Sequence, residues 1–317
     1  MIAASIFAPI LAPSLYVSAW VVGWNPASIS TFEKQAAKLS EIMPERYEVS
    51  AAGTIALKSS WKEADWKRVQ AAARKHKVKV LGMVHNFVLP DGFDAKRMSL
   101  LLNDPKKVKA AVSDLLAFVK KDSLDGIDLD LESMAVSDRN AFSSFVTALA
   151  KALHGQKKIL SVTVHPKESE PGNWDGPKAH DWKAIGAVAD RVKIMCYDVH
   201  WSTSDAGAIA PTDWVTRVAK FAMIQMPASK VDIGVAWYGY DWRQKPALSL
   251  TYSDLSRLPF RMDASSGELV QMDKVYFSGR AAFEQKVAAL KALGLNKVSA
   301  WYVGSEDPDV WRVIPSK

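Results

Sequence analysis

Four acidic residues fall within eight positions of the segment DGIDLDLE, residues 125–132. Asp128, Asp130 and Glu132 alternate with aliphatic residues. Successive side chains of a β-strand point to opposite faces, so these three carboxyl groups share one face of a strand. Carboxyl groups spaced about 6.6 Å apart along a strand cannot all ionise cheaply in a confined space. The pKa of part of the set should therefore rise, as a general acid near neutral pH requires.

Three interpretations of this acidic face are open. The first is a set of catalytic carboxyl groups inside a barrel, which the uniformly aliphatic opposite face favours. The second is a metal site, where three carboxylates without a nearby histidine would suit Mg²⁺ or Ca²⁺. The third is a solvated acidic turn. Asp125 has the opposite parity, and we expect it to bond backbone at the start of the strand.

Strand-like and helix-like segments alternate along the whole chain. Eight strands are predicted at residues 16–24, 49–57, 78–87, 124–132, 159–165, 191–198, 231–239 and 297–304. Helices are predicted near residues 30–42, 62–76, 105–121, 137–153, 181–189, 211–225, 279–292 and 308–314. This alternation predicts an α/β fold, a (β/α)8 TIM barrel. A doubly wound open sheet is the alternative, but its glycine-rich fingerprint is missing after the first strand.

In a barrel, the two faces of the acidic strand have different surroundings, and so do its two ends. Residues facing the helices should be aliphatic, whereas inward residues line the interior and the mouth. Glu132 comes last on its strand, at the carboxyl-terminal rim where barrel active sites are built.

A single (β/α)8 domain is predicted over residues 16–317. Residues 240–277, rich in Ser, Pro and Asp, predict a small insertion between the seventh and eighth strands. Residues 1–15 carry no charge and read as a leader, a weak signal-like segment without a basic start, or a truncated start.

Charge and residue counts limit the classes of binding partner that we expect. The net charge is +7, but Lys and Arg are spread over the helical segments and no nucleic-acid-binding signature occurs, so no nucleic acid is expected. No segment predicts a stable membrane span. One cysteine excludes a disulfide framework, and twelve tryptophans slightly favour a carbohydrate or nucleotide ligand that stacks on aromatic rings.

The motif DGIDLDLE resembles the D-G-x-D-x-D-x-E signature of glycoside hydrolase family 18, the chitinase-like barrels. Three further segments resemble that family: IMCYD (194–198), IGVAWYGYDW (233–242) and VSAWYVGSEDPDVW (298–311). Together with VHNF (84–87) and GAIAPTDWV (207–215), the last of these is most similar to the branch of bacterial spore-cortex and cell-wall glycosidases.

The resemblance implies catalytic roles for four residues. Glu132 would protonate the glycosidic oxygen and then act as base toward water. The 2-acetamido oxygen of the substrate would be the nucleophile, so no second protein carboxylate attacks the sugar. Asp130 would orient the acetamido group, Asp128 would share a proton with Asp130, and Tyr197 would hydrogen-bond the acetamido oxygen.

Substrate contacts are expected from six more residues. The resemblance implies that Asp198 bonds a sugar hydroxyl and that Trp301 forms the floor under the sugar at the cleaved bond. Met195 shares the inward face of its strand with Tyr197. The ends of other strands add the last three expected cleft residues, Tyr238, Asn86 and Trp24.

The expected protein is thus a retaining hydrolase of β-1,4-linked N-acetylglucosamine glycans, without cofactor or metal. A carbohydrate-binding barrel without activity is the alternative, and the presence of Glu132 favours the enzyme. We expect a monomer that is secreted or associated with the cell wall. Peptidoglycan and chitin-like substrates, and endo and exo action, remain open at this point.

Overall fold

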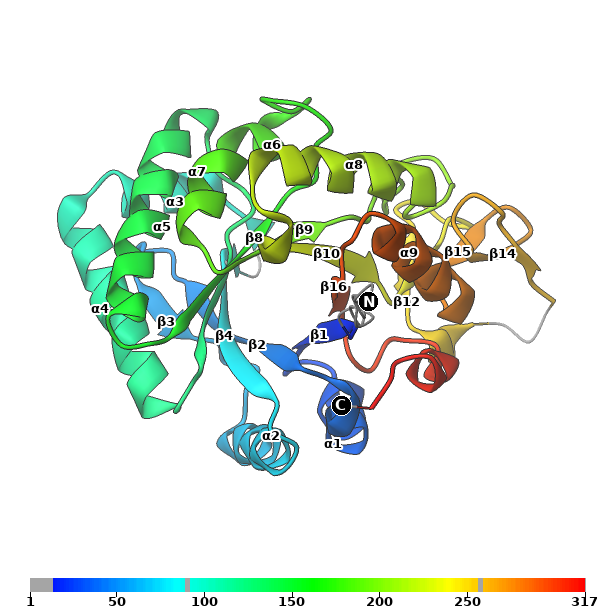
Figure 1. The fold of residues 1–317 in the computed structure, drawn as a ribbon, viewed down its shortest axis with the longest axis horizontal. Coiled ribbons are helices and arrows are strands. Elements are labelled where there is room, and N and C mark those ends of the chain that lie inside the picture. Colours follow the sequence, from blue (N-terminus) through cyan, green and yellow to red (C-terminus); the bar gives the residue numbers. More distant parts are fainter. Residues whose placement is uncertain (1–13, 89–91, 256–258, 317) are drawn as a thin grey trace, which may run out of the picture.

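Eight parallel strands close into a barrel in the computed structural model of the chain, which describes residues 14–88, 92–255 and 259–316 (Figure 1). They are β1 (Tyr16–Val21), β2 (Glu41–Val49), β4 (Lys79–His85), β7 (Gly126–Asp130), β8 (Ile159–Val164), β9 (Arg191–Met195), β10 (Val231–Ala236) and β16 (Lys297–Trp301). Strand β1 pairs with both β16 and β2, which closes the sheet. The predicted (β/α)8 barrel is confirmed, whereas positions 1–13 of the predicted leader lie outside the described residues.

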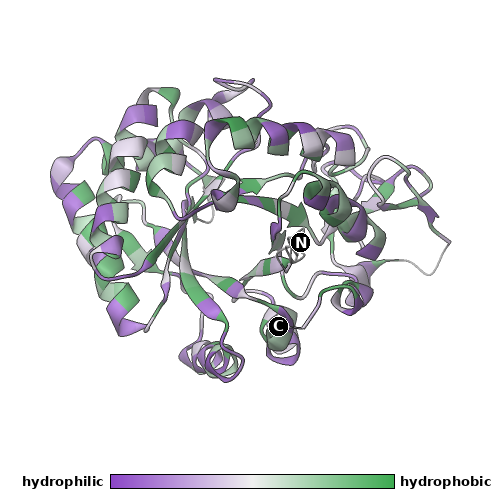
Figure 2. Ribbon diagram, in the orientation of Figure 1, coloured by the Kyte–Doolittle hydropathy of each residue, from purple (hydrophilic) through white to green (hydrophobic). Residues whose placement is uncertain are grey.

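Helices surround the strands and turn their apolar sides inward (Figures 1 and 2). They are α1 (Pro26–Gln35), α2 (Glu63–Lys75), α3 (Ala95–Leu102), α4 (Pro105–Lys121), α5 (Arg139–His154), α6 (Asp175–Ala179), α7 (Trp182–Val188), α8 (Thr212–Gln225) and α9 (Arg280–Ala292). Short 3-10 turns cover Ala36–Lys38, Val136–Asp138, Ala228–Lys230, Tyr252–Asp254 and Pro308–Arg312. Asn25, Asp94, Asp104 and Asp181 cap helices by accepting backbone N–H groups of the first turn.

The second barrel strand differs from the prediction. Residues 49–57 were expected to form it, but the barrel strand is β2, and β3 (Ile55–Leu57) folds back on it as an antiparallel hairpin. The prediction was wrong because β2 carries charged side chains that normally mark a surface segment. Glu41 and Arg46 are nevertheless buried, since each is paired with an opposite charge inside the protein.

The insertion between β10 and β16 is a five-stranded antiparallel sheet, as the sequence suggested. Its strands are β11 (Gly239–Asp241), β12 (Leu248–Leu250), β13 (Arg261–Met262), β14 (Leu269–Gln271) and β15 (Val275–Phe277). A second, two-stranded hairpin, β5 (Phe87–Val88) and β6 (Gly92–Phe93), follows β4.

A buried carboxylate fixes the insertion to the barrel. Glu268 accepts hydrogen bonds from the N–H groups of Ile209 and Ala210, both at 2.9 Å, in the segment that leads into α8. On the other side, Lys286 of α9 donates to the Ser266 carbonyl at 3.0 Å. The sheet is therefore anchored to two elements of the barrel's outer ring.

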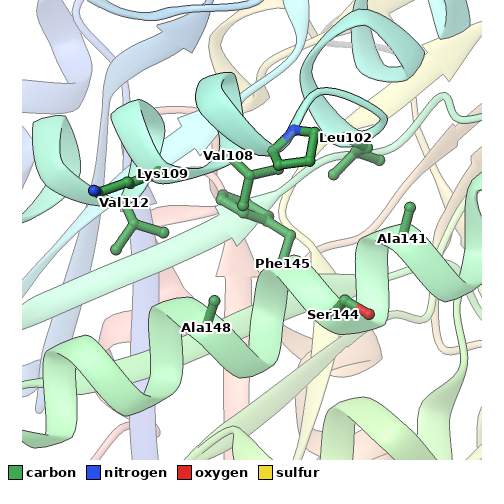
Figure 3. A pocket seen from close by; sticks show the side chains of 9 residues that line it. Leu102, Val108, Lys109, Val112, Ala141, Ser144, Phe145 and Ala148 are labelled. Carbon is green, nitrogen blue, oxygen red and sulfur yellow. The ribbon is translucent and has the colours of Figure 1, made fainter.

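A hollow on the outside of the barrel lies between α4 and α5 (Figure 3). Val108 and Val112 of α4 face Phe145 and Ala148 of α5 across it. Its lining is almost wholly apolar and includes none of the residues expected to act on a substrate. The residues expected to act on a substrate lie at the mouth of the barrel instead.

The start of β7 is shaped by Asp125 and Gly126. Asp125 accepts the Val80 N–H at 2.8 Å, which confirms the expected bond to backbone. At Gly126 a side chain is excluded, because an added Cβ would lie 2.0 Å from the Ile159 carbonyl oxygen on β8. The glycine of the acidic motif thus lets β7 and β8 approach each other.

Gly126→Ala should lower the free energy of unfolding by about 3 kcal/mol, the upper end of what overpacking usually costs. The clash is with backbone, which cannot rotate away as a side chain can. Urea denaturation of both proteins measures the difference. Gly155→Ala is the matched control, since a Cβ there meets its nearest atom at 3.4 Å. Equal stability of Gly126→Ala and wild type would contradict this account of the motif.

Candidate active site

The three carboxyl groups of the acidic face lead from the barrel mouth into its interior. Glu132 lies two residues beyond the end of β7, and its side chain is 24% exposed. Asp130 is 5% exposed and Asp128 is fully buried. This burial excludes the solvated acidic turn, and it leaves Glu132 as the most exposed member of the set.

The backbone around Glu132 is held by side chains of neighbouring strands. Asn86, just beyond β4, accepts the Glu132 N–H at 3.0 Å and donates to the Ser133 carbonyl at 3.0 Å. His165, just beyond β8, donates from Nε2 to the Glu132 carbonyl at 3.2 Å. The position of the carboxyl group is therefore set by strands on both sides of β7.

Asn86 departs from the role predicted for it. It was expected to contact substrate, but its side chain is fully buried and both ends of its amide bond backbone. We assign it a positioning role, through the backbone of Glu132.

Burial raises the pKa of Glu132 to about 8, and the nearby negative charge of Asp198 adds to the rise. Glu132 is thus protonated at neutral pH. Burial also raises the pKa of Asp130 well above its usual value, followed by the charges of Glu132 and Asp128. Asp130 Oδ1 is buried and has no hydrogen-bond partner among the described residues. It is free to meet a polar group of a ligand.

Asp128 is surrounded by donors. It accepts from Trp20 Nε1 at 3.1 Å and from Thr163 Oγ1 at 3.3 Å. Lys193 Nζ lies 3.6 Å from its other oxygen. These neighbours satisfy both oxygens of Asp128, whereas Asp130 Oδ1 has no partner among the described residues. The predicted sharing of a proton between Asp128 and Asp130 remains a prediction.

A buried ion network lies beneath Asp128. Lys193 is fully buried and donates to Glu41 at 3.0 Å and to Ser161 at 2.6 Å. Arg191 and the Tyr16 hydroxyl also bond Glu41. Burial favours the neutral amine, but the charges of Glu41 and Asp128 outweigh it and raise the pKa of Lys193. Lys193 is consequently a charged group in the barrel interior.

Sequence reasoning missed this network, although one signal for it was present. Lys193, Met195 and Tyr197 are every second residue along β9 and the segment directly after it. If the side chains of Met195 and Tyr197 point into the barrel, that of Lys193 must do so as well. Glu41 could not be found the same way, because its strand was misplaced.

Asp198 follows β9 and faces two tyrosines from the segment that leaves β10. Tyr238 donates to it at 2.5 Å and Tyr240 at 3.2 Å. Its φ of 60° is a left-handed conformation that Asp tolerates better than most residues. Burial raises the pKa of Asp198 to about 6, while the tyrosine hydrogen bonds act against that rise.

An aromatic floor adjoins these carboxyl groups. Trp301 at the end of β16 is half-buried and packs edge-on against Trp20, with ring centroids 5.8 Å apart. Tyr197 packs against Tyr238 at 6.0 Å. Met195 is 7% exposed beneath them. Apolar rings flanked by polar tips suit a pyranose, whose faces are apolar and whose edge carries hydroxyls.

Trp24 lies at the rim and remains 49% exposed. Its Nε1 donates to Glu45 at 2.8 Å, and Glu45 is also paired with Lys58. Glu45 is a cleft-side carboxylate that the sequence prediction did not include, again because β2 was misplaced. Within the described ranges no cluster of three or more His, Cys, Asp or Glu residues could hold a metal ion.

Removal of the Asp198 charge should shift the pH profile. If Glu132 is the general acid that the sequence predicts, activity should fall above about pH 8, because the residue then loses its proton. Asp198→Asn removes a negative charge that raises the pKa of Glu132, so the alkaline limb of kcat/KM should move to lower pH. The limb position is independent of any loss in rate.

Asp205→Asn is the matched control for this shift. Asp205 lies in the same loop, but its side chain is 95% exposed and screened by solvent. Its profile should match that of wild type. An alkaline limb that stays in place in Asp198→Asn would refute the proposed influence of Asp198 on the acid.

Comparison with known proteins places this geometry in a family. The family described as "Glycosyl hydrolases family 18" matches residues 15–306. An uncharacterized glycosylase, YvbX, of Bacillus subtilis is 27% identical over 261 residues, which cover 76% of each chain. The cortical fragment-lytic enzyme of Bacillus anthracis is 28% identical over 242 residues, or 70% of this chain and 56% of that protein.

A solved structure agrees in fold. The chitinase from Chromobacterium violaceum superposes with a TM-score of 0.85 at 25% identity, covering 95% of this chain and 98% of that one. No helix in the described part of the chain is long and apolar enough to cross a membrane.

Proposed function

Because this chain belongs to glycosyl hydrolases family 18, we propose that it hydrolyses β-1,4 linkages of N-acetylglucosamine-containing glycans with retention of configuration. The observation that carries the proposal is Glu132, a carboxyl group at the barrel mouth whose pKa is raised to about 8. Such a group is protonated at neutral pH and can act as a general acid. Its backbone is fixed from both neighbouring strands, which suits a catalytic position.

In the first step Glu132 gives its proton to the glycosidic oxygen as the bond from C1 to that oxygen breaks. The acetamido oxygen of the same sugar forms the new bond to C1, which gives a cyclic oxazolinium and a free leaving sugar. In the second step water attacks C1, Glu132 takes the proton from that water, and the ring opens. Both substitutions invert C1, so the product keeps the starting configuration.

The state of Asp130 supports this route over a protein nucleophile. A carboxyl group must be ionised to attack C1, whereas burial, followed by the neighbouring carboxyl groups of Glu132 and Asp128, raises the pKa of Asp130 well above its usual value and so disfavours the ionised form. A protonated Asp130 can instead bond the acetamido group through its free Oδ1. Tyr197 would bond the acetamido oxygen, Asp198 a sugar hydroxyl, and Trp301 would form the floor.

The relatives' names support two glycan classes. One relative is named as a cortical fragment-lytic enzyme and one structural neighbour as a chitinase. Both names are compatible with a glycan outside the cytoplasm, so we propose a secreted or wall-associated protein whose partner is an N-acetylated polysaccharide.

Two measurements test the proposed function. Release of reducing ends from chito-oligosaccharides and from purified peptidoglycan shows which glycan is cut. Proton NMR of the first product shows its anomer, and the β-anomer is expected. An α-anomer would exclude retention, and binding without cleavage of either glycan would leave a carbohydrate-binding barrel instead of an enzyme.

A further inference from the structure

The side chain of Trp174 is half exposed, although contacts with the protein hold its ring in place. It precedes α6 in the loop after β8, and 51% of its surface is accessible. Its ring lies against Gly176, where an added Cβ would come within 2.4 Å of the ring atoms. The ring also packs on His165, with centroids 4.6 Å apart. One side of the indole is therefore fixed by the protein while the other is open.

The contact with His165 extends to a second histidine. His165 and His180 stack with ring centroids 5.4 Å apart and an interplanar angle of 20°. The backbone N–H of His165 donates to His180 Nδ1 at 3.1 Å. The ring proton of His180 therefore sits on Nε2, which donates to the Leu131 carbonyl at 3.1 Å. His165 itself donates to the Glu132 carbonyl.

Both imidazoles favour the neutral form, and at His180 the bonding pattern requires it, because Nδ1 accepts a hydrogen bond. Burial lowers the pKa of His165 to about 4 and that of His180 well below its usual value. Trp174, His165 and His180 thus form an aromatic cluster, in which Trp174 packs edge-on against His165 and the two histidines bond consecutive carbonyls of the segment that carries Glu132.

The contact with His165 also places Trp174 near Glu132. His165 Nε2 lies 3.9 Å from Glu132 Oε2, and the Trp174 ring packs edge-on against His165. In the closed barrel β7 and β16 are opposite each other, four strands apart in either direction, whereas β8 is the neighbour of β7. Trp301 on β16 therefore lies across the barrel from Glu132, and Trp174 lies in the loop after the strand next to it.

We propose that Trp174 is a binding platform for a sugar on the leaving-group side of the cleaved bond. The inference rests on the proposed function, in which the sugar over Trp301 keeps C1 and Glu132 protonates the oxygen that departs. A glycan that continues past Glu132 reaches the loop after β8. There the open side of the indole offers the flat apolar surface on which a β-1,4-linked pyranose stacks.

The test compares two substrates with different leaving groups. Chitohexaose places sugars on both sides of the bond, whereas β-chitobiosyl fluoride has a single-atom leaving group that cannot reach Trp174. Trp174→Ala should lower kcat/KM for chitohexaose about tenfold, mainly through KM, and leave fluoride release unchanged. Trp174→Phe, which keeps a smaller ring, should fall between the two.

Ile224→Ala is the control for loss of exposed apolar surface. Ile224 is 77% exposed on α8, and its removal should change neither rate. An equal loss on both substrates in Trp174→Ala would overturn the proposal, since the ring would then only support the acid's loop. No loss on either would overturn it as well. Failure of wild type to cleave both substrates would instead refute the proposed function.

Discussion

Glu132→Gln should lower kcat/KM for chito-oligosaccharides about a thousandfold, within the range that general acid catalysis supplies. Glutamine keeps the size of the side chain and its place after β7, but it cannot give a proton to a sugar leaving group. The backbone bonds from Asn86 and His165 do not involve the carboxyl group, so the fold should be unchanged. Reducing-end assays on both proteins measure the effect.

A substrate that needs no proton separates the acid from other roles of Glu132. Fluoride leaves as an anion, so the first step on β-chitobiosyl fluoride should be much less sensitive to Glu132→Gln. A single-turnover measurement is appropriate, because the later attack of water still requires a base. Glu284→Gln, on the outer surface of α9, is the control and should retain full activity. If Glu132→Gln cleaved the oligosaccharides at the wild-type rate, the acid would be another residue.

Lys193→Met should destabilise the protein by about 3–5 kcal/mol, the usual cost of removing one partner of a buried ion pair. Lys193 lies between Glu41 and Asp128, and all three side chains are fully buried. Methionine fills similar space without charge, so the loss measures the pairing and not a cavity. Urea denaturation followed by circular dichroism gives the free energy of unfolding.

Two further variants make this result specific. Lys183→Met removes an exposed lysine of α7 and should change stability by less than about 0.5 kcal/mol. Lys193→Met combined with Glu41→Gln removes both charges, so its cost should be smaller than the sum of the single costs. Strict additivity of the two changes, or a single variant as stable as wild type, would show that the pair contributes nothing.

The acidic motif allowed more to be predicted than any other segment. Alternation alone divided β7 into an inward polar face and an outward aliphatic face. The structure agrees, because Asp128 lies among inward donors while Leu129 joins the outer apolar core. A period of two is a property of one strand, and it can be read without knowing the neighbours.

Features that depend on several strands could not be predicted in this way. The charges of β2 indicate a surface segment until Lys193 and Arg191, some 150 positions later, are known to lie beside them. Asn86 is of a residue type that commonly contacts ligands. Only the path of the Glu132 backbone shows that its side-chain amide bonds that backbone instead. Ionic and amide pairing across strands leaves no periodic trace in the sequence.

The anchored insertion has a consequence for how such a protein can evolve. The acid and its supports belong to the barrel strands and the segments directly after them, whereas Tyr240 and Trp242 come from the added sheet. Contacts of Glu268 and Ser266 join the sheet to the outer ring of the barrel, and Tyr240 joins it to Asp198. Mutations in residues 239–277 can therefore reshape one wall of the cleft and change which glycans fit, while the groups that break the bond are inherited intact.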